Sequence, residues 1–216
     1  MPKGNKTLVN GLIWAVLGIV VVTISVLFVK TRLDQAIRLS EKMPVYSQVP
    51  DFVLTNQLGS AVTANDLAGQ VWVACIVFTR CPGPCPKMAG KMAELQKLWP
   101  AETPIRFVTL TTDPGYDTVP VMKKFSDRFQ AESGRWHFLT GPKSEIVRLA
   151  VGGLKLTTLD KEPGDRASDD DLFIHSTVFM LVDQKGRVRG SFESLEPGFE
   201  AQVKAAADLL LRTHSR

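Results

Sequence analysis

The sequence predicts one α/β sandwich domain preceded by a single transmembrane helix. The helix is predicted by the uncharged apolar run of residues 8–29. The domain is predicted by two further patterns: residues 71–111 show strand, helix and strand character in turn, and residues 176–213 show a hairpin pattern followed by an amphipathic helix. Strands and helices that alternate through a parallel crossover, then end in a hairpin, are typical of an α/β sandwich.

The apolar run of residues 8–29 has the length of a membrane span. Its 22 residues, at a rise of about 1.5 Å each, are enough to cross a hydrocarbon layer of about 30 Å. A cleaved signal peptide is the alternative, but its apolar region is usually about 7 to 15 residues long, and no small-x-small cleavage site precedes Lys30. We therefore expect a short segment, residues 1–7, followed by an uncleaved anchor at 8–29.

Charge is concentrated next to this anchor. Residues 1–42 hold six basic and two acidic residues and so account for the whole net charge of +4, whereas the remainder holds 20 of each sign. A nucleic-acid interface needs a clustered basic face, and this balanced charge gives no support for one. Residues 30–49 are expected to be a stalk, helical as far as Lys42 and then interrupted by Pro44 and Pro50, with the folded domain at 50–216.

Within the domain, residues 71–79 (VWVACIVFT) form a continuous β-branched run, which is typical of a strand buried on both faces. Residues 87–99 place apolar side chains at helical spacing, and residues 105–111 return to strand character. Residues 157–171 are polar and are expected to be a loop. The other expected elements are strands at 52–54, 61–63, 136–139, 176–182 and 188–192, and helices at 117–129, 144–150 and 198–213.

The residues with the clearest chemistry are Cys81 and Cys85, in the sequence TRCPGPCP between the buried strand and the next helix. Backbone N–H groups and the helix dipole at such a position favour a thiolate. If the loop winds as a first helical turn, the four-residue spacing brings the two sulfurs to one face, where they can form a disulfide or hold a soft ion such as Cu(I) or zinc. A stapling disulfide, or two buried thiols, is the alternative. Cys75, in the middle of the strand, is expected to be a buried core residue.

A metal held by two thiolates needs a further ligand, and the chain has three histidines. His137 lies in an apolar strand, where a structural histidine is commoner, and His214 lies at the terminus. His175 lies between an acidic loop and the strand at 176–182, although its position alone favours a ligand no more than a structural role. A structural zinc site prefers four ligands, and no fourth Cys or His is evident.

Four motifs taken together indicate a protein family more specifically than the cysteines or the histidines do alone. They are Cys81-x-x-x-Cys85-Pro86 after an apolar strand, Asp113-Pro114 with Asp117-Thr118, the sequence WHFLTG at 136–141, and His175-Ser176-Thr177 ahead of a strand. In these motifs the chain resembles the SCO/SenC family of copper-binding assembly factors.

This resemblance implies a thioredoxin-like fold that binds one copper ion, Cu(I) or Cu(II), through Cys81, Cys85 and His175. It also implies that Cys81 and Cys85 form the redox-active disulfide pair. The implied partner is the copper-site subunit of cytochrome c oxidase, with other copper chaperones or thiol reductants as further partners.

Members of the family are tethered to a membrane with the domain outside the bacterial cytoplasm or in the mitochondrial intermembrane space. The absence of an Arg-rich presequence favours the bacterial inner membrane, with the domain on its periplasmic or outer side.

The alternative function is a membrane-anchored thiol–disulfide oxidoreductase without a metal role, which the dithiol at a helix start also favours. Typical thioredoxins space their cysteines by two residues and carry a cis-proline opposite them, whereas residues 175–177 contain no proline. A structural module stapled by its disulfide is a third possibility. Asp113 and Asp117 are expected to orient the cysteine loop or a partner, and capping of the helix that begins near Thr118 is an equally good role for Asp117.

Overall fold

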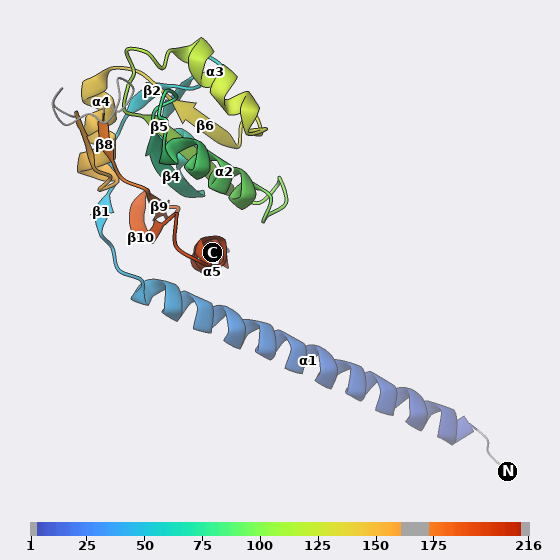
Figure 1. Cartoon of the computed structure of the whole chain (residues 1–216). Helices are drawn as coiled ribbons and strands as arrows, with labels where there is room; N and C mark the ends of the chain where they lie inside the picture. Colours follow the sequence, from blue (N-terminus) through green and yellow to red (C-terminus); the bar gives the residue numbers. More distant parts are fainter. Residues whose placement is uncertain (1–3, 161–172, 213–216) are drawn as a thin grey trace. The chain divides into compact units, whose positions relative to one another are not determined.

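The structure is a computed structural model, and it describes residues 4–160 and 173–212. Its contacts divide the chain into two compact units, one ending at Lys42 and the other beginning at Met43. The first unit is the helix α1, Gly4–Lys42. The second is an α/β domain with helices on both faces of a sheet, which confirms the predicted fold class (Figure 1).

Helix α1 contains the predicted membrane span. Its segment Ile13–Arg32, 20 residues with a mean hydropathy of 2.5, is long and apolar enough to cross a membrane, and no part of the protein covers its side chains. A helix whose apolar residues are exposed around its whole circumference suits a lipid environment. The helix continues beyond the predicted anchor and ends at Lys42, two residues before Pro44, which cannot donate a helical hydrogen bond.

The domain is built on a six-stranded sheet in the order β1-β10-β9-β4-β5-β6. Strands β4, β5 and β6 are parallel, whereas β9 is antiparallel to β4 and β10 is antiparallel to both β9 and β1. The sheet strands are β1 Ser47–Gln48, β4 Val71–Val77, β5 Ile105–Thr111, β6 Trp136–Leu139, β9 Val178–Val182 and β10 Arg187–Glu193. Two short hairpins lie outside it: β2 Val53–Thr55 with β3 Ala61–Thr63, and β7 Thr158–Asp160 with β8 Phe173–His175.

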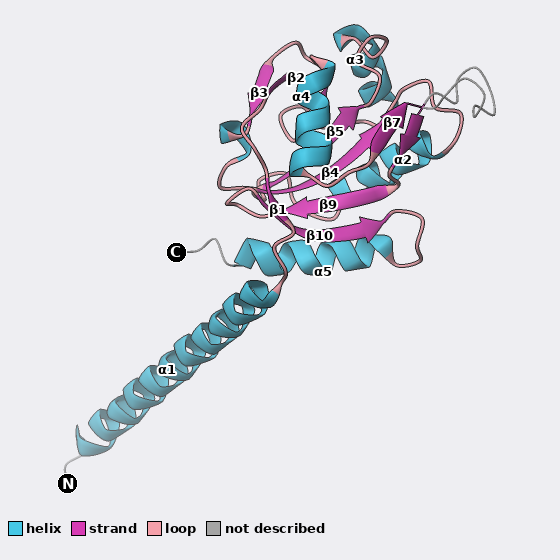
Figure 2. Cartoon of the chain, turned by 90° about the vertical axis from the view of Figure 1, so that its left-hand side faces the viewer, coloured by secondary structure: helices cyan, strands magenta, loops and turns pink. Residues whose placement is uncertain are grey.

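Strand β4 is the centre of the fold, and all seven of its residues are buried, as predicted. Alternate side chains point to opposite faces. Val73, Cys75 and Val77 pack in one core with the helices α2 Pro84–Gln96, α3 Val119–Arg128 and α5 Phe199–Leu211. Trp72 and Ile76 pack in the other core, beneath the β2–β3 hairpin and α4 Lys143–Val147, which Figure 2 brings in front of the sheet.

Most differences from the predicted elements are at their ends. Helix α2 begins at Pro84, three residues earlier than predicted, so that Cys85 is inside it. Helix α4 is extended by a π-helical turn, η2 Arg148–Gly153, and a 3₁₀ turn, η1 Asn65–Leu67, follows β3. The expected loop at 157–171 contains the strand β7 over its first residues, and its residues 161–171 lie outside the described part of the chain.

Residues 43–48, which we expected in the stalk, are attached to the domain. Strand β1 pairs with β10, and Tyr46 N–H donates to the Val188 carbonyl at 2.9 Å. The guanidinium of Arg189 donates to the carbonyls of Met43 and Pro44 at 2.9 and 3.1 Å. A two-residue strand is too short to show an alternating pattern, so the sequence did not indicate this attachment.

Candidate functional site

The two predicted cysteines lie together where β4 ends and α2 begins. Cys81 is in the loop after Phe78, and Cys85 is the second residue of α2. Pro84 opens the helix at a position where no intrahelical N–H bond is made, which suits a proline. Both cysteines belong to the core cluster beneath α2, where Cys81 is 7% exposed and Cys85 is fully buried. The site therefore reaches the surface on the Cys81 side.

Backbone N–H groups point at both sulfurs. Phe78 N–H donates to Cys85 Sγ and Gly83 N–H donates to Cys81 Sγ, each at 3.4 Å. Cys81 N–H in turn donates to the Phe78 carbonyl at 3.2 Å, which closes the loop against the end of β4. Such donors stabilise a sulfur that carries negative charge, whether as a free thiolate or as a metal ligand.

The two thiols also interact with each other. A hydrogen bond with Cys81 raises the pKa of Cys85 above its usual value, and burial raises it further. Cys81 is therefore the more exposed of the two thiols, and Cys85 is harder to ionise than a free thiol. Cys75 is fully buried, and this burial raises its pKa to about 12, which confirms its expected role as a core residue.

The third predicted site residue, His175, is described only by its backbone. It ends strand β8, where it lies opposite Thr158. Strand β9 follows two residues later and runs antiparallel to β4 with Met180 opposite Ala74. Ala74 and Met180 are the last residue pair described between these two strands on the side of the cysteine loop. The described pairings therefore do not extend to His175, and its place beside the cysteines stays a prediction.

The remaining histidines do not join the cysteines in the described structure. His137 lies in β6, which is separated from β4 by β5. Burial lowers its pKa, and Arg106 lowers it further. His214 lies outside the described residues. Among the side chains that the structure describes, no three His, Cys, Asp or Glu residues form a cluster able to hold a metal.

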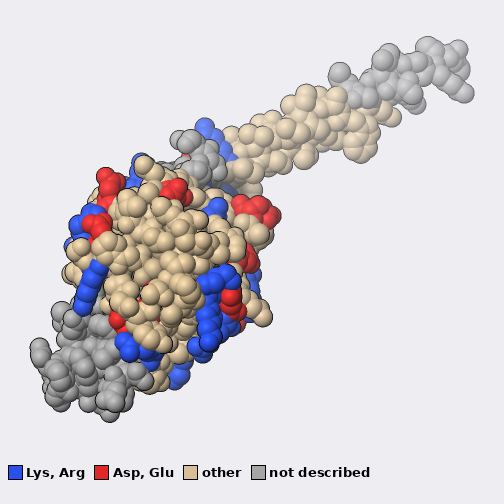
Figure 3. All heavy atoms as spheres, turned by 90° about the horizontal axis from the view of Figure 1, so that it is seen from above, with Lys and Arg blue, Asp and Glu red and all other residues tan. Residues whose placement is uncertain are grey.

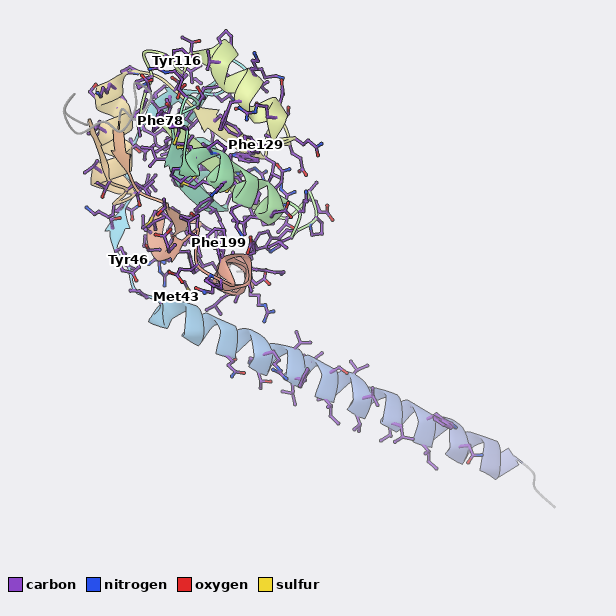
Figure 4. The ribbon with its side chains drawn as sticks, in the orientation of Figure 1. Met43, Tyr46, Phe78, Tyr116, Phe129 and Phe199 are labelled. Atoms are coloured by element: carbon purple, nitrogen blue, oxygen red, sulfur yellow. The ribbon has the colours of Figure 1, made fainter. Side chains whose placement is uncertain are left out.

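Beside the cysteine loop lies a cluster that the sequence reasoning missed. The guanidinium of Arg80 is paired with Asp113 at 2.6 Å and lies over the ring of Tyr116, 4.2 Å from its centroid. Tyr116 is 46% exposed, whereas Phe78, also labelled in Figure 4, is buried. Residues 113–117 carried a motif, but only the pairing of β4 with β5 shows that this motif reaches Arg80.

The expected cap at Asp117 is not formed. The N-cap of α3 is Thr118, and no side chain makes a capping bond there. The carboxylate of Asp117 is fully buried and accepts hydrogen bonds from Thr79 and Thr111 instead. Burial raises the pKa of Asp117, although these hydrogen bonds oppose the shift.

The domain surface seen from above Figure 1 has few charges at its centre. Lysine, arginine, aspartate and glutamate side chains gather toward its edge, and the middle is occupied by other residues (Figure 3). This is also the side on which Tyr116 lies (Figure 4). A face with few charges at its centre suits contact with another protein better than binding of a highly charged ligand.

Comparisons with known proteins agree on one family. A family model described as SCO1/SenC matches residues 41–210. The SCO1 protein homolog of Bacillus subtilis is 34% identical over 157 residues, which cover 72% of this chain and 78% of that protein.

Two solved structures show the same fold. BsSco, described as a Sco-family cytochrome c oxidase assembly protein with a disulfide switch, is 29% identical with a TM-score of 0.65, covering 80% of this chain and 97% of that one. Bradyrhizobium japonicum ScoI, described with copper bound, is 24% identical with a TM-score of 0.62, covering 76% and 98%.

Proposed function

Because this chain belongs to the SCO1/SenC family, we propose that it is a membrane-tethered copper chaperone and thiol-redox factor. It serves the assembly of the binuclear copper site of cytochrome c oxidase, and the copper-site subunit of that enzyme is its partner. The observation that carries the proposal is the pair of adjacent thiols, Cys81 and Cys85, at the start of α2, each accepting a backbone N–H.

The donor chemistry fits one copper ion as cargo. Thiolate sulfur is a soft ligand that selects Cu(I), and imidazole nitrogen suits copper in both oxidation states. Cys81 and Cys85 supply the sulfurs, and His175 supplies the nitrogen. The relative ScoI, described with copper bound, supports this assignment. Cys81 lies at the accessible side of the site, which gives a recipient protein a route to the metal.

The same thiols give the protein a redox function. When the pair forms a disulfide, the two thiols lose two electrons and two protons, and both pass to the oxidising disulfide, which becomes a dithiol. The disulfide no longer offers thiolate ligands, so copper binding and oxidation of the pair exclude each other. The relative BsSco, described with a disulfide switch, supports this cycle.

The tether completes the proposal. Helix α1 anchors the chain in a bacterial inner membrane, with the domain on the periplasmic or outer side. A domain held at the membrane meets a membrane-bound oxidase subunit at a much higher effective concentration than a free domain does.

Copper titration of the full-length chain in detergent tests the metal site. Under anaerobic, reducing conditions we expect one Cu(I) per chain by native mass spectrometry, and none in the Cys81→Ser, Cys85→Ser double variant. His175→Ala is expected to weaken Cu(II) binding at least tenfold and to remove a nitrogen coupling from the electron paramagnetic resonance spectrum. His137→Ala, on another strand, is the matched control and keeps wild-type binding. Equal copper in the wild type and the double variant would refute the site.

The second candidate function is a membrane-anchored thiol–disulfide oxidoreductase without a metal. The hydrogen bond between the two thiols favours it, because a buried Cys85 behind an accessible Cys81 is the arrangement of a resolving and an attacking thiol. Reduction of a model disulfide by a wild-type chain that binds no copper would establish this function in place of the first.

A further inference from the structure

Asp117 has a carboxylate that neither contacts solvent nor caps a helix. It lies between β5 and α3, is fully buried, and directs its side chain toward the end of β4. A buried carboxylate costs free energy unless its oxygens are well hydrogen-bonded, so its partners indicate what the fold uses it for.

Each hydrogen-bond partner of this carboxylate among the described residues is a donor. Thr79 donates its backbone N–H to Oδ2 at 3.1 Å and its hydroxyl to Oδ1. Thr111 donates its hydroxyl to Oδ2 at 2.5 Å. The two oxygens therefore accept bonds from the ends of both β4 and β5. These bonds join the two strands just beyond Val77 and Thr111, the last residue pair of their parallel ladder.

Thr79 links these hydrogen bonds of the Asp117 carboxylate to the cysteines. It follows Phe78, whose N–H donates to Cys85 Sγ and whose carbonyl accepts from Cys81 N–H. No regular secondary structure holds the chain between the end of β4 and the start of α2. The direction in which the chain enters the cysteine loop is therefore fixed at Thr79, by its backbone and its side chain together.

We infer that Asp117 is a positioning residue that sets the separation and orientation of the Cys81 and Cys85 sulfurs through Thr79. Its carboxylate bonds to Thr79 and Thr111 rather than to either sulfur, and it is not proposed as a ligand. By holding the loop before copper or an oxidant arrives, it reduces the conformational entropy that closing the pair would cost. This role deepens the proposed function, since it concerns the same two thiols.

The test compares Asp117→Ala with Asp117→Asn in the full-length chain in detergent. Alanine removes both acceptors, whereas asparagine keeps one oxygen for Thr79 N–H and can donate to the Thr111 hydroxyl. We expect Asp117→Ala to weaken Cu(I) binding at least tenfold in a chelator competition, and Asp117→Asn to stay within threefold of wild type. Equal loss in both variants would show that charge matters rather than position and would overturn the inference.

Asp183→Asn is the matched control. Asp183 is also a buried carboxylate, but it follows β9 near the other end of β4, about 20 Å away for a seven-residue strand. Its loss should lower the melting temperature without changing Cu(I) affinity more than twofold. If Asp117→Ala does not fold, Thr79→Val removes only the hydroxyl bond and is expected to weaken Cu(I) binding by about threefold. An unchanged affinity in that variant would refute the inference.

A second measurement does not depend on copper. In dithiothreitol buffers, two electrons and two protons pass from the Cys81 and Cys85 thiols to the cyclic dithiothreitol disulfide, which becomes its dithiol. Loss of positioning should lower the equilibrium constant for this oxidation about tenfold in Asp117→Ala, or about 30 mV. If the wild type bound no copper, the proposed function would fail while this shift still supported the positioning role. An unchanged constant in folded Asp117→Ala would overturn it.

Discussion

At the scale of single residues, the two cysteines of the site differ in what they can do. Cys81 is 7% exposed, whereas Cys85 is fully buried with a raised pKa caused first by its hydrogen bond with Cys81. A thiol must reach its target and ionise to attack it. Under the proposed redox function we therefore expect Cys81 to exchange with a partner's disulfide and Cys85 to resolve the mixed disulfide.

Alkylation of the native, reduced chain tests this division. With iodoacetamide at pH 8, we expect peptide mass spectrometry to find Cys81 modified first, and the fully buried Cys85 and Cys75 much later or not at all. The pKa of Cys75, raised to about 12 by burial, leaves almost no thiolate at that pH. The control is the chain unfolded in guanidinium chloride, in which all three cysteines should react at similar rates. Early labelling of Cys75 in the folded chain would contradict the assignment.

The residues also show where sequence reasoning stops. Cys81 and Cys85 could be found from the sequence because the strand before them and the helix after them are local patterns. His175 was assigned through family resemblance, because contacts between distant segments leave no local pattern. For Asp117 the sequence left capping and orientation of the cysteine loop open for the same reason: capping is a local rule, whereas its partner Thr79 is 38 residues away and becomes a neighbour only when β4 pairs with β5.

At the scale of elements, the attachment of residues 43–48 to the domain depends on one buried ion pair. Arg189 lies 2.8 Å from Asp183, and both side chains are almost fully buried. Burial alone would raise the pKa of Asp183, but hydrogen bonds from Arg187 and Arg189 outweigh this effect and lower it. The same guanidinium donates to the Met43 and Pro44 carbonyls. The Arg189–Asp183 pair therefore fixes the residues that lead from helix α1 into strand β1.

Removal of this guanidinium should destabilise the domain. We expect Arg189→Met to cost about 3 kcal/mol in urea unfolding at pH 7, because it leaves the buried Asp183 short of a partner. Arg187 also pairs with Asp183 but is 36% exposed, so Arg187→Met should cost less than about 1 kcal/mol.

The loss of unfolding free energy caused by Arg189→Met should depend on pH in a defined direction. A carboxyl group whose pKa is lowered by folding stabilises the fold above its unfolded pKa of about 3.9, and this contribution is lost as pH falls through the lower folded value. The penalty in Arg189→Met should therefore be smaller at pH 3 than at pH 7. Equal losses of unfolding free energy in Arg189→Met and Arg187→Met at pH 7 would contradict this account of the buried Arg189–Asp183 pair.

The elements that the sequence predicted well are those with long, uniform patterns. The strand at 105–111 has the bounds expected for it, and the buried run at 71–79 became β4 as far as Val77. The π-helical turn η2 and the two-residue strand β1 were not predicted, because neither has a distinct periodicity. Their hydrogen bonds depend on segments far away in the chain, such as that from Ser47 Oγ to the Gly153 carbonyl at 2.5 Å.

At the scale of the whole molecule, the chain joins a long apolar helix to a domain with almost no linker. The first unit ends at Lys42, and Arg189 already binds the carbonyls of Met43 and Pro44. A short linker limits the distance over which a tethered domain can search, while it raises the effective concentration of the domain near the membrane. Under the proposed tether, we expect the recipient to present its copper site within reach of a domain held at the membrane.

Two truncations test where the domain begins. A chain starting at Met43 keeps β1 and the Arg189 bonds, so it should be soluble without detergent and melt within about 2 °C of the domain in the full-length chain. A chain starting at Asp51, close to the boundary expected from the sequence, loses both features and should melt roughly 5 °C lower or more. Circular dichroism measures both transitions, and their Cu(I) affinities serve as the control, since neither truncation removes a proposed ligand. Identical melting temperatures would show that residues 43–50 belong to the stalk, and that the bonds between Arg189 and the chain entry contribute nothing to the stability of the domain.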